Sequence, residues 1–168
     1  MLRFQDMPKQ YYKDWMQVAF EEAQHFNMLR ERLQKLGCDY GDFDAHNGLW
    51  EMAMKTRGSV IARMALVPRV LEARGLDVTP GMIKRLENQG DLETVEILKI
   101  IFEQEIGHVA IGSRWFKYAC EQENLDPENT FRNLLNAYMS GELRGPFELE
   151  ARKKAGFSNL ELEAIQSI

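Results

Sequence analysis

The chain has 168 residues, 45% of them hydrophobic and 28% charged, and a formal net charge of −5. This size suits a single domain over residues 1–168 with a well-buried core. The acidic balance argues against a broad nucleic-acid-binding surface, and no apolar run has the length of a membrane span. Cys38 and Cys120 lie far apart and form no C-x-x-C pair, which predicts reduced thiols in a cytoplasmic protein.

The first half of the chain predicts two long helices. Pro8 suits the first turn of a helix over residues 8–36, and Gly37 is a typical stop after its last turn. A polar connection follows, and a second long helix is expected over residues 48–75. Pro68 lies inside that range and should kink the helix or split it.

The second half predicts one more long helix and several short ones. Thr79 and Pro80 suit an N-cap and a first helical turn, so a separate short helix is expected over residues 80–88. Asp91 is expected to cap a long helix over residues 91–123. Further short helices are predicted over residues 127–140, 148–154 and 159–167. No alternating strand pattern of useful length occurs, so the predicted fold class is all-α.

Two Glu-x-x-His pairs stand out on the first and third long helices. Glu105 and His108 lie in an apolar stripe, three residues apart, so both side chains leave one helix face. Glu22 and His25 repeat this arrangement. A carboxylate on a buried stripe costs on the order of several kcal/mol unless it is paired or bound to a metal. Hydrogen-bonded polar pairs are the alternative explanation, but two matching pairs favour a metal site.

The same pattern occurs in metal-binding four-helix bundles. Two Glu-x-x-His helices, plus one Glu from each of two further helices, hold the di-iron or di-manganese sites of such bundles. Carboxylates and imidazoles without thiolates favour iron or manganese over a structural zinc ion. Another helix must then supply a carboxylate, and the pattern alone leaves Glu51 and Glu72 as candidates. His46, in the connecting loop, follows no such Glu and is not expected to be a ligand.

Four longer runs carry a family resemblance: Trp50–Ala53, Arg63–Arg69, Leu71–Met82 and Gly107–Phe116. They closely resemble a bacterial ferritin-like family known as domain of unknown function 455, and the resemblance covers essentially the whole chain. More distantly, the Glu-Ala-Arg run is similar to that of the tRNA-hydroxylating di-iron monooxygenases. The resemblance implies a ferritin-like helical bundle with short C-terminal helices, and it selects Glu72 over Glu51. The implied metal ligands are Glu22, His25, Glu72, Glu105 and His108.

The resemblance also implies an earlier helix with a further Glu, for which the sequence before residue 8 leaves no room. The bundle is therefore expected to lack its first helix and to have an incomplete metal site. Such a bundle should expose an apolar flank, which a homodimer would cover. The residues expected on this flank are Tyr12, Trp15, Phe26 and Phe102.

The function implied by the resemblance is oxygen activation at two iron ions, or at manganese. Such an oxidase or hydroxylase would use dioxygen and an unknown small or macromolecular substrate. One alternative is a non-catalytic iron-binding or ferroxidase protein. Another is a metal-free helical interaction module, because one ligand-bearing helix is expected to be absent.

Overall fold

The computed structural model of the protein describes residues 3–139 and 143–167. These residues form a helical bundle and contain no strand, which confirms the all-α fold class. The elements in chain order are α1 (Lys9–Lys35), α2 (Gly48–Lys55), α3 (Val60–Leu66), the π-helical segment η1 (Val67–Glu72), α4 (Ala73–Gln89), α5 (Leu92–Gln122), α6 (Pro127–Met139), α7 (Leu149–Lys154) and α8 (Asn159–Gln166).

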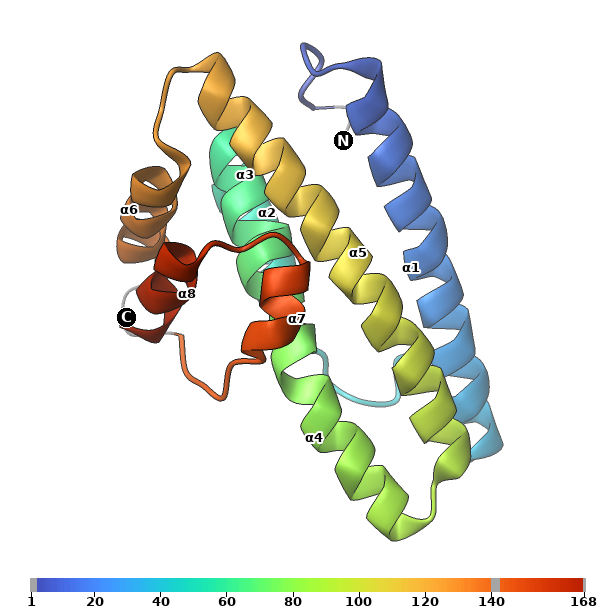
Figure 1. The fold of residues 1–168 in the computed structure, drawn as a ribbon. Helices are drawn as coiled ribbons and strands as arrows, with labels where there is room; N and C mark the ends of the chain where they lie inside the picture. Colours follow the sequence, from blue (N-terminus) through green and yellow to red (C-terminus); the bar gives the residue numbers. More distant parts are fainter. Residues whose placement is uncertain (1–2, 140–142, 168) are drawn as a thin grey trace.

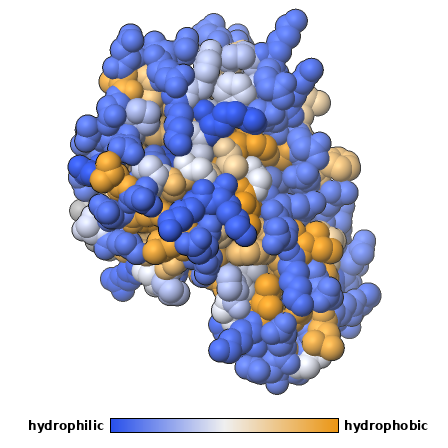
Figure 2. Space-filling view, in the orientation of Figure 1, coloured by the Kyte–Doolittle hydropathy of each residue, from blue (hydrophilic) through white to orange (hydrophobic). Residues whose placement is uncertain are grey.

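The long helix α5 runs through the middle of the bundle (Figure 1). It packs against α1 on one side and against α3, η1 and α4 on another. The short helices α6, α7 and α8 lie on the side of α5 away from α1 (Figure 1). Figure 2 shows hydrophobic side chains scattered among hydrophilic ones on this face of the molecule. Within the described ranges, no helix combines the length and the apolar character needed to cross a membrane.

The first and third long helices begin and end within a residue of their predicted bounds. Gly37, with φ 84°, follows the last turn of α1 and takes the left-handed conformation that favours glycine. Asp91 caps α5, because its side chain accepts a hydrogen bond from the backbone N–H of Thr94. The stop at Gly37 and the cap at Asp91 were both predicted from local sequence signals, and both are confirmed.

The single helix expected over residues 48–75 is wrong, because the chain leaves the helix between α2 and α3. Ser59 starts the new helix as its N-cap, accepting a hydrogen bond from the backbone N–H of Ala62. Gly58, just before it, is a poor helix former by about 1 kcal/mol relative to Ala. A cap and a helix breaker side by side therefore outweigh the apolar periodicity.

Pro68 interrupts the α-helix, as predicted: α3 ends at Leu66, the π-helical segment η1 contains Pro68, and α4 follows from Ala73. Proline has no N–H for the α-helical ladder and clashes with the preceding turn, so a wider turn accommodates it. Gly112 of α5 lies directly against this segment. A Cβ at Gly112 would come within 2.6 Å of the Pro68 ring, so glycine is what allows α5 and η1 to pack this closely.

The separate helix expected over residues 80–88 is also wrong. Pro80 lies inside α4, which continues from Ala73 to Gln89 and ends at Gly90. An interior proline costs about 3 kcal/mol. The buried side chains of Leu76 and Thr79 offset this cost, because α4 packs along α5.

The C-terminal helices are fastened to the bundle by two buried ion pairs. Arg69 in η1 lies 2.8 Å from the carboxylate of Glu161 in α8, and Arg152 in α7 lies 2.7 Å from Asp77 in α4. The guanidinium of Arg69 also stacks within 4.8 Å of three aromatic ring centres, those of Phe116, Phe131 and Phe157. The predicted extension of α6 to residue 140 lies outside the described residues.

Candidate metal centre

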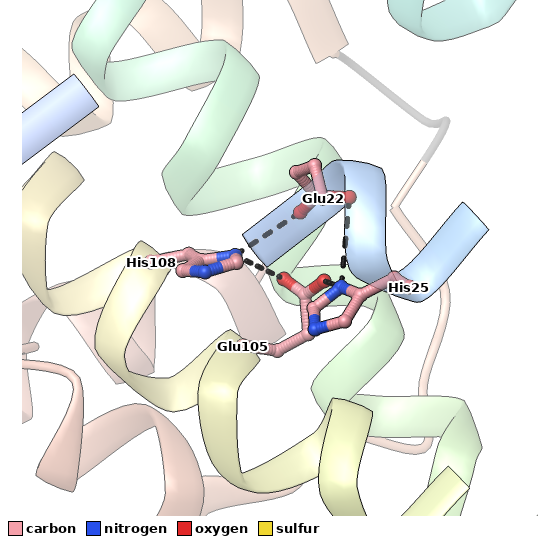
Figure 3. A group of neighbouring side chains, drawn as sticks. All are labelled: Glu22, His25, Glu105 and His108. Carbon is pink, nitrogen blue, oxygen red and sulfur yellow. Dashed lines mark hydrogen bonds and ion pairs between the residues drawn. The ribbon is translucent and has the colours of Figure 1, made fainter. Parts of the chain in front are cut away.

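The two Glu-x-x-His pairs come together where α1 packs against α5 (Figure 3). One potential ligand atom from each of the four side chains lies within 4.8 Å of those of the other three. This set is called the Glu–His group below, and its members are Glu22, His25, Glu105 and His108.

The burial of the group differs between its members. His25 and His108 are almost fully buried, with 4% and 1% of their surface exposed. The Glu105 side chain is 15% exposed, whereas that of Glu22 is 47% exposed. The sequence pattern predicted a buried carboxylate at both positions, and this is wrong for Glu22. The group is therefore closed on the α5 side and more open beside α1.

Both imidazoles turn their Nδ1 atoms towards the two carboxylates (Figure 3). Nδ1 of His108 lies 3.0 Å from Glu22 and 3.6 Å from Glu105. Nδ1 of His25 lies 3.6 Å from Glu22 and 3.5 Å from Glu105. Both rings thus present the same nitrogen to one shared space.

The Nε2 atoms of the two histidines are fixed by neighbours outside the group. Nε2 of His25 lies 2.7 Å from the amide oxygen of Gln104, and Nε2 of His108 lies 2.7 Å from the carboxylate of Glu21. Because both partners accept, each Nε2–H donates, which leaves Nδ1 of a neutral ring free to bind a metal. Gln104 and Glu21 were not predicted from the sequence. Their only sequence signal is that each directly precedes the Glu of a Glu-x-x-His pair.

Several buried polar atoms at this place lack a hydrogen-bond partner in the described part of the chain. They are Nδ1 of His25, Oε2 of Glu105 and Oε2 of Glu72. Buried polar atoms in proteins are nearly always hydrogen-bonded, and a bound ion is one of the standard explanations for exceptions. Unpaired ligand-type atoms from α1, α5 and η1 therefore fit a bound cation.

Glu72, the last residue of η1, lies beside the Glu–His group. Burial, followed by the negative charges of Glu105 and Glu22, raises the pKa of Glu72 to about 7. The other candidate, Glu51, lies exposed in the first turn of α2 and is not a member of the group. His46 is exposed and accepts a hydrogen bond from the backbone N–H of Gly48, and it too is not a member.

The charges within the group favour a cation at its centre. Burial lowers the pKa of His108, but its contacts with Glu105, Glu22 and Glu21 outweigh this effect and raise the pKa to about 10. The hydrogen bond from His108 in turn lowers the pKa of Glu22. Without a metal, the imidazolium of His108 is thus the positive charge that faces the carboxylates.

Replacing Glu21 with alanine is expected to weaken metal binding about 10-fold to 100-fold. This is the usual effect of removing a carboxylate that orients a ligating histidine. Glu103→Ala is the matched control, because Glu103 is an exposed acid on α5. Competition with a chelating dye would measure both affinities. Equal affinities in the two variants would contradict the role of Glu21.

Comparison with known proteins gives a family but no activity. A family described as "Protein of unknown function (DUF455)" matches residues 1–163. An uncharacterized protein of Haemophilus influenzae is 46% identical over 158 residues, which are 94% of this chain and 55% of that protein. The chain therefore spans about half the length of this relative. No solved structure matches the chain.

Proposed function

Since the chain belongs to the family described as "Protein of unknown function (DUF455)", we propose that it is a ferritin-like metal protein of the oxygen-activating type. Its Glu–His group and Glu72 would hold two ions of iron, or of manganese. The protein would then be an oxidase or hydroxylase of the cytoplasm, which the free thiols of Cys38 and Cys120 support.

The observation that carries the proposal is the set of unpaired buried atoms on Glu72, Glu105 and His25. Hydrogen bonds within the protein would satisfy these atoms if the group were only structural. Their donor types, carboxylate oxygen and imidazole nitrogen without thiolate, suit iron or manganese. The set has one carboxylate fewer than the four-Glu, two-His pattern of di-metal bundles.

Each residue has a distinct part in this proposal. His25 and His108 would each bind one metal through Nδ1, while Glu21 and Gln104 hold the two rings in place. Glu22, Glu72 and Glu105 would supply carboxylate oxygens to the ions, and Oε2 of both Glu72 and Glu105 is unpaired among the described residues. When bound, reduced iron or manganese supplies the electrons that dioxygen chemistry needs. The buried side chains of α5 shield the group on one side, whereas Glu22 leaves it open to solvent beside α1.

Metal analysis of protein purified without chelator tests the proposal. We expect iron or manganese in the protein, and consumption of dioxygen after anaerobic loading with Fe(II). Dioxygen consumption without turnover of any organic substrate would favour a ferroxidase. Protein without metal, and unable to bind added Fe(II) or Mn(II), would contradict the proposal and favour a helical interaction module.

We also propose that the chain forms a homodimer, although the apolar flank differs from the prediction. Tyr12, Trp15 and Phe102 are partly buried against the core, whereas Phe26 is 43% exposed. The most exposed apolar side chains of α1 are those of Met16 and Phe20, at 61% and 60%. They are four residues apart and so lie on one face of the helix.

Light scattering at micromolar concentration is expected to give a mass near twice 19.5 kDa. Phe20→Lys should shift the protein towards monomer, because it places a charge in the apolar contact. Gln17→Lys is the control, since Gln17 is an exposed polar residue of the same helix. A wild-type mass near 19.5 kDa would contradict the dimer.

A further inference from the structure

A cavity of about 250 Å³ lies beside the Glu–His group, between α1 and the α3–η1 segment. It is called the α1–η1 pocket below. The residues that line it are Tyr11, Trp15, Val18, Ala19, Arg63, Met64, Val67, Pro68 and Glu72. Glu72 therefore belongs to the wall of this pocket and also lies next to the proposed metal ligands.

The pocket has two different ends. Tyr11 and Trp15 lie one turn apart on α1, with ring centroids 6.3 Å apart, and they line the pocket together with Arg63 at the end nearer the start of α1. Glu72 interacts with the charges of Glu22 and Glu105, which places it at the metal end. Along α1, Tyr11 and Glu22 are about 16 Å apart at 1.5 Å per residue. Because Tyr11 and Glu72 line the same pocket, a bound molecule can contact both of them.

The far end offers hydrogen-bond donors to a bound molecule. Arg63 has no carboxylate within 4.0 Å among the described residues, although its guanidinium donates to Thr56 and to the backbone oxygen of Ala53. The Trp15 indole N–H is buried and has no hydrogen-bond partner among the residues that the structure describes. Tyr11 is 1% exposed, and burial, the largest influence, raises its pKa to about 12, so its hydroxyl stays protonated as a donor.

The space between the two ends is apolar. Its walls are the side chains of Val18, Met64, Val67 and Pro68. At about 30 Å³ per water molecule, a cavity of this size has room for roughly eight waters. That volume fits an unbranched chain of moderate length. An arginine without a counter-ion next to such walls favours an anionic head on an apolar body.

We infer that the α1–η1 pocket binds a small carboxylic acid with an apolar chain, whose carboxylate contacts Arg63, Trp15 and Tyr11 and whose chain points to Glu72. The position of Glu72 would make this molecule the substrate of the metal centre, and this part of the inference rests on the function proposed above. The chain carbons, rather than the carboxylate, would lie next to the metals.

Calorimetric titration with octanoate, octan-1-ol and octylamine tests the pocket on metal-free and on metal-loaded protein. We expect octanoate to bind at least tenfold more tightly than octan-1-ol, and octylamine to bind more weakly than either. These three probes share one chain and differ in the charge of the head group. Equal affinity for octanoate and octan-1-ol would overturn the inference.

Two variants locate the carboxylate. Arg63→Gln is expected to weaken octanoate binding at least tenfold, whereas Arg57→Gln, at an exposed arginine nearby, should leave it unchanged. Because Arg63 also bonds the α2–α3 connection, Trp15→Phe provides a second variant, which removes the N–H and keeps an aromatic wall of smaller size. It should weaken octanoate binding several-fold. Full affinity in Trp15→Phe and Arg63→Gln would overturn the assignment.

Metal content and mass, measured on the same samples, separate the possible failures. Metal-loaded protein that does not bind octanoate would contradict carboxylate binding in the pocket but would not contradict the proposed metal centre. Protein that binds octanoate but cannot hold metal would overturn the proposed function and leave a carboxylate-binding pocket. Octanoate binding that disappears as a dimer forms would mean that a second copy fills the pocket, which also overturns the inference.

Discussion

Replacing His108 with alanine is expected to reduce the metal content of the purified protein to a small fraction of the wild-type value. His108 is 1% exposed and turns Nδ1 towards both Glu22 and Glu105. Its loss removes one of only two imidazole ligands and also the positive charge that faces the carboxylates. A loss of at least 100-fold in metal affinity is therefore expected, larger than the effect of removing Glu21.

The third histidine provides a matched control for this experiment. His46 is exposed in the loop before α2 and bonds only locally, to the backbone of Gly48. His46→Ala should retain the wild-type metal content. Elemental analysis and circular dichroism of both variants would distinguish loss of metal from loss of fold. Unchanged metal in a folded His108→Ala protein would show that the ligand assignment is wrong.

Loading the protein with Fe(II) or Mn(II) is expected to raise its melting temperature by about 5–15 °C. Binding to the folded state alone adds about 3–4 kcal/mol when free metal exceeds Kd by 100-fold to 1,000-fold. For a chain of this size, each kcal/mol shifts the melting temperature by about 2–4 °C. The physical source is the repulsion among Glu22, Glu72 and Glu105, which a cation relieves.

The difference between loaded and metal-free protein should grow as the pH rises. In the folded, metal-free protein the pKa of Glu72 is raised from 4.5 to about 7 and that of His108 from 6.5 to about 10. A group with a raised folded-state pKa stabilises the fold below its ordinary pKa, and this contribution is lost as the pH rises through the raised value. Metal-free protein should therefore lose stability between about pH 5 and 10. Melts at several pH values, with and without metal, would measure this, and coincident melts would contradict the metal centre.

The sequence predicted which four polar side chains come together better than it predicted the helices that carry them. The three-residue spacing in each pair fixed which side chains share a helix face, and the structure brings the two faces together. The family match over residues 1–163 confirms the family identified from the sequence motifs. Spacing within one helix is a local property, so it can be read without knowing how the helices pack.

The errors arose where packing decided the outcome. Pro80 is a strong signal for a helix start, but the burial of α4 against α5 keeps it inside a continuous helix. Glu22 is half-exposed because its side of α1 is not fully covered by other helices. The spacing of apolar residues in the sequence does not show which side of a helix is covered. Glu21 and Gln104 were missed for the same reason, since each reaches a histidine on the other helix.

The π-helical turn of η1 allows one short segment to face two directions. In an α-helix, side chains three residues apart share a face. In η1, however, Arg69 faces Glu161 and the aromatic rings beneath the C-terminal helices, whereas Glu72 faces the Glu–His group and the pocket. Deleting a single residue between Arg69 and Glu72 would change the direction in which one of these side chains points relative to the other. The length of this segment therefore couples the anchoring of the C-terminal helices to the orientation of the carboxylate at the proposed metal centre.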